Sequence, residues 1–161
     1  MSVSRGQPDD NFDDLADRER PDGVFAPRFD EAGLLPVFVT DSVTGEALMQ
    51  AWMNRVALER TMSTGVAHYF SRSRSRIWKK GEESGHIQLV HEVRIDCDQD
   101  ALLLKVEQKG GAACHTGFRS CFYRALRMDE SGRIGFTEPD SSRVFDPRQV
   151  YSPNEHSRRD A

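Results

Sequence analysis

The sequence has no run of about 18 consecutive apolar residues, which a membrane-spanning helix requires. Its first residues also lack the basic stretch and hydrophobic block of a secretory signal. We therefore expect a soluble, cytoplasmic protein with no membrane partner. At 161 residues and 37% hydrophobic content, the chain is long enough for one domain with one modest core.

Cysteine is scarce, with three residues at positions 97, 114 and 121. The odd number and a reducing compartment disfavour disulfides and leave free or metal-bound thiols. Structural zinc modules usually have four ligands in close pairs, whereas these cysteines are separated by sixteen and six residues. Three ligands and an open position are typical of catalytic zinc. Three ordinary buried cysteines are the alternative.

The net charge of −4 hides an uneven distribution. Residues 1–33 carry a net charge of −5 and residues 129–161 a net charge of −2, which leaves +3 for residues 34–128. Residues 1–33 are polar and rich in Pro and Gly, so we expect a largely irregular N-terminal extension. The basic middle part favours an anionic ligand.

Three aspartates flank the first cysteine at alternate positions, Asp96, Asp98 and Asp100. Carboxylates this close repel one another unless a cation lies between them, and Mg²⁺ is the natural partner. With Glu107 they match part of an EF-hand loop, but Ala101 stands where that loop needs glycine. We therefore favour a strand here, and a solvated acidic edge is the alternative to a metal site.

Local patterns predict the first elements of the domain. Residues 34–41 read as a strand, and residues 44–53 as its hairpin partner after a Thr-Gly turn. Asn54 is an N-cap for a helix over residues 55–64, which Gly65 ends. This helix should place Ala57, Leu58, Thr61 and Met62 on one side.

Further strands are predicted for residues 66–72, 87–100 and 102–108. In the second of these, the apolar face continues through Cys97 and the polar face through the three aspartates. Residues 114–128 should form a final strand or a short irregular segment, and residues 129–161 an irregular tail. We expect an α+β fold, a small mixed antiparallel sheet or roll with one or two short helices, with residues 34–128 as its domain.

The segment after residue 70 is basic, with Arg72, Arg74 and Arg76 at alternate positions. If this segment is extended, the three guanidinium groups share one face and form a cationic strip. An exposed basic loop or a weak RNA-binding stretch is the alternative.

His115 follows Cys114 directly. This histidine is a fourth metal ligand, a general base or a satisfied polar residue, and we favour the base.

Four motifs together resemble the phosphoribosyl-AMP cyclohydrolases of histidine biosynthesis. They are AWMN at 51–54, HYFSRSRSRIWKKGEESGH at 68–86, IDCDQDALLLKVEQ at 95–108 and CHTGFRSCFY at 114–123. The similarity extends in unbroken order from about Leu34 to Leu126. One departure is Phe118, where the family more often has a basic residue, and this bears on phosphate binding at that position.

The resemblance implies a metal-dependent hydrolase that acts on a C–N bond of a cyclic amidine. Such enzymes open the adenine ring of phosphoribosyl-AMP at the N1–C6 bond by zinc-hydroxide hydrolysis. It also implies an intertwined homodimer with zinc ligands shared between subunits. Carried over by motif, Cys97, Cys114 and Cys121 would hold Zn²⁺, and Asp96, Asp98 and Asp100 would hold Mg²⁺.

The same resemblance gives the basic segment an anionic partner, a small phosphorylated nucleotide with two phosphate groups. Arg72, Arg74, Lys80 and Arg119 are the expected phosphate contacts. His115 is the expected catalytic base, and Glu82 and His86 are candidates for further polar contacts with the substrate.

Two other functions fit parts of the pattern. A zinc-stabilised RNA-binding module would use the Ser-Arg segment, lose affinity steeply with salt and show no turnover. A regulatory calcium- or magnesium-binding protein would use the aspartates and tolerate serine at all three cysteines.

Overall fold

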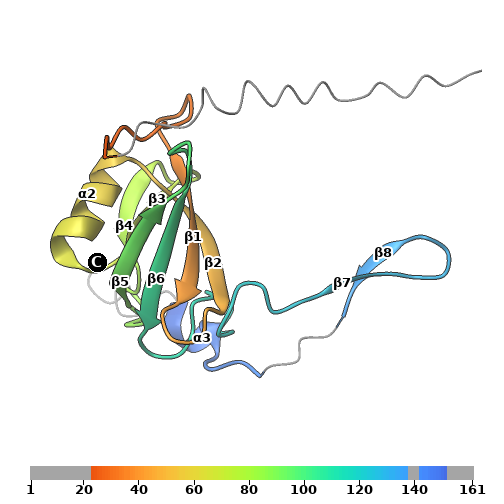
Figure 1. Ribbon diagram of the computed structural model, residues 1–161. Helices are drawn as coiled ribbons and strands as arrows, with labels where there is room; N and C mark the ends of the chain where they lie inside the picture. The colour runs from red at the N-terminus through yellow and green to blue at the C-terminus, as the bar shows by residue number, and fades with distance from the viewer. Residues whose placement is uncertain (1–22, 138–141, 152–161) are drawn as a thin grey trace, which may run out of the picture.

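The computed structural model describes residues 23–137 and 142–151. Residues 1–22, most of the predicted N-terminal extension, and part of the predicted tail lie outside the described residues. Within the described part, the elements form a mixed α+β fold with a small, mostly antiparallel sheet and two helices (Figure 1). None of the helices in this part has the length and apolar character needed to cross a bilayer.

The central sheet has four strands in the order β2-β1-β6-β5. They are β1 (Leu35–Asp41), β2 (Ala47–Met53), β5 (Gln88–Ile95) and β6 (Leu102–Gln108). β1 pairs antiparallel with β2, β5 pairs antiparallel with β6, and β1 and β6 run parallel. Because β1 and β6 are parallel, their C-terminal ends lie at the same edge of the sheet. The loops that follow the two strands therefore start side by side.

The helix α2 (Arg55–Thr64) has the predicted bounds and caps. The Asn54 side chain accepts a hydrogen bond from the Ala57 backbone N–H at 2.9 Å, and Gly65 ends the helix at a φ of 68°. Ala57, Leu58 and Thr61 are buried, but Met62 is 64% exposed. The buried face is therefore narrower than we predicted.

The hairpin of β3 (His68–Ser71) and β4 (Arg76–Lys79) packs with α2 on the sheet. The prediction that Arg72, Arg74 and Arg76 lie along one extended strand is wrong. Residues 72–75 form the turn of this hairpin, with Ser75 at a φ of 49°. Arg72 and Arg74 are therefore not on one strand face with Arg76.

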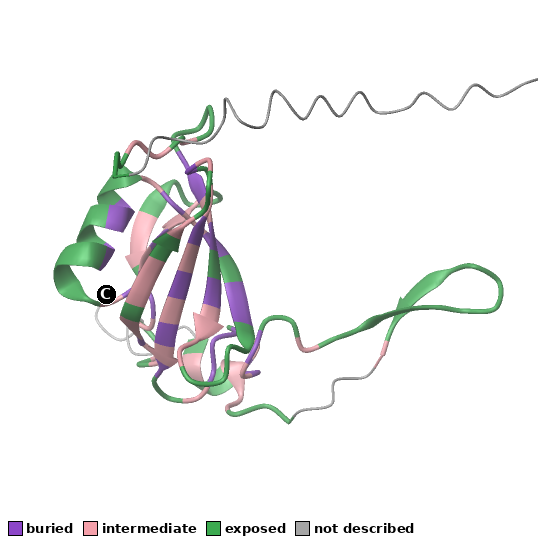
Figure 2. Ribbon diagram, viewed as in Figure 1, coloured by how far each residue is buried: buried purple, intermediate pink, exposed green. Residues whose placement is uncertain are grey.

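The core lies between the sheet and the layer formed by α2 and the β3–β4 hairpin (Figure 2). β6 alternates strictly, with Leu102, Leu104 and Val106 buried and the residues between them half-buried. A period of two is what a strand with one covered face requires.

The aspartate segment is not a strand. β5 ends at Ile95, and residues 96–100 form a turn in which Gln99 has a φ of 61°. The predicted division of Cys97 and the aspartates between two strand faces is therefore wrong. The turn is favoured because the Asp96 carboxylate accepts hydrogen bonds from the backbone N–H groups of Asp100 and Ala101.

The predicted irregular tail contains two short regular segments. β8 (Ile134–Phe136) pairs with β7 (Leu126–Met128), and α3 is a short helix (Pro147–Tyr151). The β7–β8 hairpin projects away from the rest of the fold, and its residues are exposed (Figures 1 and 2). We call residues 124–137 the arm.

A buried polar chain crosses the core. The Tyr69 hydroxyl donates to Gln88 Oε1 at 2.6 Å, and Gln88 Nε2 donates to Gln108 Oε1 at 2.8 Å. Tyr69 and Gln88 are both fully buried, and burial raises the pKa of the Tyr69 hydroxyl, which stays a donor.

Tyr69→Phe should destabilise the fold, because it leaves the buried Gln88 oxygen without its donor. We expect a loss of about 1–3 kcal/mol in the free energy of unfolding, measured by urea titration at a fixed protein concentration. Tyr151→Phe, at a 40% exposed residue, is the matched control and should change stability by less than about 0.5 kcal/mol. Equal stability of the two variants would contradict the importance of this chain of hydrogen bonds.

Candidate active site

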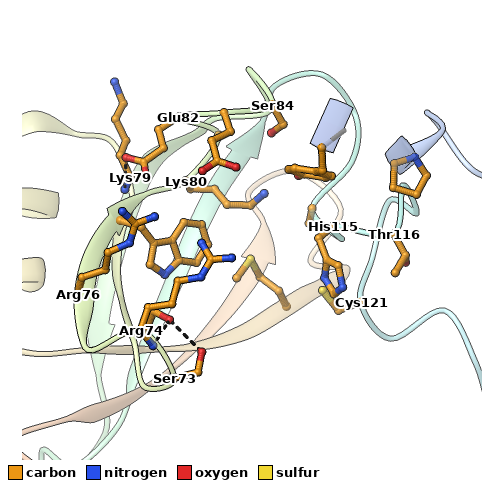
Figure 3. A pocket seen from close by; sticks show the side chains of 18 of the residues that line it. Ser73, Arg74, Arg76, Lys79, Lys80, Glu82, Ser84, His115, Thr116 and Cys121 are labelled. Carbon is orange, nitrogen blue, oxygen red and sulfur yellow. Dashed lines mark hydrogen bonds between the residues drawn. The ribbon is translucent and has the colours of Figure 1, made fainter. Parts of the chain in front are cut away.

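A cavity of about 970 Å³ opens beside the β3–β4 hairpin. Its walls come from β2, the β3–β4 hairpin, the turn at residues 80–84, the loop at residues 113–121 and α3. In Figure 3, Arg74 and Lys80 reach from one wall toward His115 and Cys121 on the other. The volume lies at the upper end of the range of about 300–1,000 Å³ for small-molecule sites.

The charged side chains that line this cavity are mostly cationic. Five basic side chains take part, against the two carboxylates of Glu82 and Glu83. The basic residues are Arg74, Arg76, Lys79, Lys80 and Arg148. Positive charge gathered around a concave surface raises the local concentration of anions, so the cavity suits an anionic ligand.

Lys80 connects the cationic wall to the thiols. The residue is 6% exposed, and its backbone N–H donates to the Ala67 carbonyl at 2.9 Å. Burial lowers the pKa of the Lys80 amine, while the nearby thiols of Cys121 and Cys114 raise it. The Lys80 amine therefore lies close to both sulfurs.

Two of the three cysteines lie together at this site. The Cys121 backbone N–H donates to the Leu48 carbonyl at 2.7 Å, and Cys114 is buried with its sulfur 2.9 Å from Thr116 Oγ1. Although Cys121 is exposed as a residue, burial of its thiol and the neighbouring Cys114 raise its pKa to about 12. Such a thiol is neutral at pH 7 unless a bound cation displaces its proton.

Cys97 lies at the other end of the sheet. It is exposed in the turn that leads into β6, whereas Cys114 and Cys121 lie beyond the end of β6 (Figure 1). Seven residues of strand span about 20 Å. Within one chain, the three sulfurs therefore do not meet.

The side chains of the three aspartates converge. Each offers an oxygen, and these oxygens lie within 4.8 Å of one another in the turn at residues 96–100. Desolvation raises the pKa of Asp100, and so do the adjacent carboxylates of Asp96 and Asp98. A cluster of negatively charged oxygen ligands that repel one another suits Mg²⁺ or Ca²⁺.

Three predicted substrate contacts do not line the cavity, namely Arg72, His86 and Arg119. The Arg72 guanidinium lies 4.6 Å from the centre of the Trp52 ring. His86 Nδ1 lies 3.3 Å from the Ala112 carbonyl oxygen, and its ring meets Phe145 edge-on at 4.7 Å. Phe118, the departure from the family pattern, is buried and stacks on Tyr123 at 3.9 Å.

Arg119 is held by two carboxylates on the β1–β2 turn. Its guanidinium donates to Glu46 at 2.7 Å and to Asp41 at 2.9 Å. The pKa of Asp41 is lowered to about 2, first by the hydrogen bond from the Thr44 backbone and also by those from the Val43 backbone and the Arg119 guanidinium. Arg119 thus fixes the cysteine-bearing loop to the sheet, and its contact with substrate stays a prediction.

Five predicted site residues do line the cavity, Arg74, Lys80, Glu82, His115 and Cys121. Sequence reasoning missed the contribution of α3, whose Pro147, Arg148 and Tyr151 complete the lining. The Asp146-Pro147 pair was the available signal, because Asp favours the N-cap and Pro the first position of a helix.

Fold and site together describe a small α+β protein whose cationic cavity suits an anionic ligand, with clustered thiols and carboxylates that suit metal ions. Residues 49–123 match the family model for phosphoribosyl-AMP cyclohydrolase. A Rhodopseudomonas palustris protein named phosphoribosyl-AMP cyclohydrolase is 58% identical over 128 residues, covering 80% of this chain and 85% of the relative. The chain belongs to the phosphoribosyl-AMP cyclohydrolase family.

Two further relatives carry the same name. The protein from R. palustris strain BisA53 is 50% identical over 93% of this chain and 97% of its own length. That from Nitratidesulfovibrio vulgaris is 55% identical over 80% of this chain and 98% of its own length. These relatives give no support to the alternative of an RNA-binding module.

Proposed function

We propose that this protein is a phosphoribosyl-AMP cyclohydrolase that hydrolyses the N1–C6 bond of the adenine ring in histidine biosynthesis. Its family membership carries this proposal. The cavity supports it, because Arg74 and Lys80 offer cationic donors to a substrate with two phosphate groups.

Zinc would be held by Cys114 and Cys121 of one subunit and Cys97 of another. The first two thiols lie together beside the cavity, while Cys97 is exposed at the opposite end of the sheet. Three thiols with an open position are the ligand pattern of a catalytic zinc site. When bound, zinc supplies a Lewis acid that makes water a nucleophile near neutral pH.

Magnesium would be held by Asp96, Asp98 and Asp100. Because Cys97 stands in the same turn as these aspartates, the subunit that delivers the third thiol also delivers the carboxylates to the cavity. The carboxylates and their bound Mg²⁺ would then lie beside the basic residues of the cavity. Mg²⁺ is often held in this way, by one or two carboxylates together with substrate phosphates.

The arm supports a dimer. Leu126, Met128, Ile134 and Phe136 are each 66–69% exposed on it. A two-stranded hairpin alone is marginally stable in water, and an apolar surface of this kind marks an interaction site. The arm begins three residues after Cys121, so a second subunit held by the arm would lie next to the proposed shared metal site.

The chain's own residues would orient the substrate and move protons. Arg74 and Lys80 would hold phosphate groups and so fix the adenine ring, which converts binding energy into orientation. His115, exposed on the cavity wall beside the thiols, would take a proton from the attacking water and return it to N1 as the C–N bond breaks.

The test is ring opening by the purified protein. With zinc and magnesium present, we expect phosphoribosyl-AMP to be converted to its imidazole carboxamide product, followed by ultraviolet absorbance. His115→Ala should lower kcat about 10²- to 10⁴-fold with a smaller change in KM. No turnover by the wild-type protein carrying both metals would contradict the proposed function.

A further inference from the structure

The C-terminal end of the described chain forms one wall of the cavity. Residues 142–151, which we call the strap, lie outside residues 49–123 that match the family model. The strap nevertheless contributes Pro147, Arg148 and Tyr151 to the lining. This wall of the cavity therefore lies outside the part of the chain that the family model matches.

The strap is fixed first to the loop that bears the cysteines. The Val144 backbone N–H donates to the Gly117 carbonyl at 2.7 Å. Gly117 has a φ of 91°, and a Cβ there would lie 2.2 Å from the Phe145 carbonyl oxygen. Only glycine lets the two backbones approach this closely, so the loop between Cys114 and Cys121 is shaped to receive the strap.

Aromatic contacts fix the strap a second time. The Phe145 ring meets the His86 ring edge-on at 4.7 Å, and the Arg143 guanidinium lies 5.5 Å from the centre of the Phe118 ring. His86 in turn packs on Gly110, where a Cβ would lie 2.7 Å from its ring. His86 therefore has a structural task here, because it supports the segment that closes the cavity.

The strap presents a positive charge to the cavity. The Arg148 guanidinium donates to both carboxylate oxygens of Asp146, at 3.2 and 3.0 Å, while its side chain stays 86% exposed. Asp146 also caps α3, because its carboxylate accepts a hydrogen bond from the Arg148 backbone N–H at 3.0 Å. A phosphate that reaches the cavity rim would therefore compete with Asp146 for this guanidinium, whose fork of donors matches either anion.

We propose that the strap is part of the substrate-binding site and that Arg148 contacts one of the two phosphate groups of the substrate. This inference rests on the proposed function for the identity of the substrate. Arg74 and Lys80 would meet the substrate from the β3–β4 hairpin and the turn that follows it, and Arg148 would meet it from α3. Tyr151 bounds the same wall beside Arg148.

The test compares Arg148→Gln with two matched variants. Arg148→Gln should raise KM about five- to tenfold and change kcat less than about twofold, since an exposed charged contact holds substrate and transition state alike. This difference in KM should shrink at about 0.5 M salt because salt screens exposed charges. Asp146→Asn keeps a capping side chain and removes a competing carboxylate, so KM should stay or fall.

Arg60→Gln, at an exposed residue on α2 away from the cavity, should leave KM unchanged. A chain that stops after residue 141 should raise KM at least as much as Arg148→Gln. An unchanged KM in both Arg148→Gln and the shortened chain would overturn the inference.

Failure of the two proposals can be told apart. If the wild-type protein shows no turnover, the dissociation constant of phosphoribosyl-AMP is measured by calorimetry instead of KM. Weaker binding by Arg148→Gln would then support the strap while the proposed function fails. Normal turnover with equal KM in all variants would leave the function standing and refute the strap.

Discussion

Serine at either Cys97 or Cys114 is expected to abolish turnover, and a mixture of the two inactive variants is expected to regain about a quarter of the wild-type activity. Each single variant should lose on the order of a thousandfold, because a lost zinc ligand removes several kcal/mol of transition-state stabilisation. The recovery follows from the position of Cys97, at the end of the sheet opposite Cys114 and Cys121.

The expected recovery of a quarter assumes that each zinc site takes its ligands from both subunits. Random reassociation makes half of the dimers mixed, and each mixed dimer pairs an intact Cys97 turn with an intact Cys114–Cys121 loop at one of its two sites. The subunits would be unfolded together in urea, refolded with zinc and assayed. Two tags of different mass would show by native mass spectrometry that mixed dimers have formed.

A second mixture is the control. Cys114→Ser and Cys121→Ser alter the same loop, so no site in their mixed dimer is intact and activity should stay at the level of the single variants. Mixed dimers of Cys97→Ser and Cys114→Ser that remain inactive would refute the shared site. Equal recovery in both mixtures would show that Cys114 and Cys121 serve different sites.

Local signals predicted the elements whose patterns are complete within a few residues. The turn at Gly45, the Asn54 cap and the alternation from Leu102 to Gln108 each specify their element without help from distant parts of the chain. Pairing between β1 and β6 is parallel and therefore had no such signal, because its partners are some sixty residues apart.

The sequence predictions were wrong where side-chain hydrogen bonds override the two-residue period of a strand. The alternation through Asp96 and Asp98 continues that of β5, but the Asp96 carboxylate accepts hydrogen bonds from the backbone N–H groups of Asp100 and Ala101, and the strand ends there. Gln99 then holds the turn, since its side chain bonds to Ala26 and Val24 at 2.8 Å. Those partners lie in the segment predicted to be irregular, and no local pattern reveals them.

The candidate site was predictable only as a set of residue types. The motifs indicated cations, thiols and a histidine, and the cavity brings Arg74, Lys80 and His115 together. The motifs did not indicate that Arg119 forms ion pairs with Asp41 and Glu46, which lie more than seventy residues away in sequence. Long-range ion pairs of this kind depend on tertiary structure that a single sequence does not display.

Asp98→Asn is expected to make the protein inactive and, without metal, more stable than the wild type. Three carboxylates whose oxygens lie within 4.8 Å repel one another, so removal of one charge should raise the melting temperature in a chelator. Magnesium should raise the melting temperature of the wild type, because a ligand that binds only the folded state stabilises it. The variant should respond much less to magnesium and should lose about a hundredfold or more of its turnover, since a site with one carboxylate fewer holds the ion poorly.

Asp98→Asn should thus raise the stability of the metal-free protein but lower its response to magnesium. These two opposite effects distinguish a metal site from an acidic turn with a purely structural role. Arg28 lies 3.8 Å from Asp98, but this single, partly exposed pair offsets little of the repulsion. Glu59→Gln, at an exposed carboxylate on α2, is the control and should change neither the magnesium response nor turnover. A wild-type protein whose melting temperature ignores magnesium, or an Asp98→Asn variant that is less stable in chelator, would mean that the turn is held by its hydrogen bonds alone and that the carboxylates do not bind the ion.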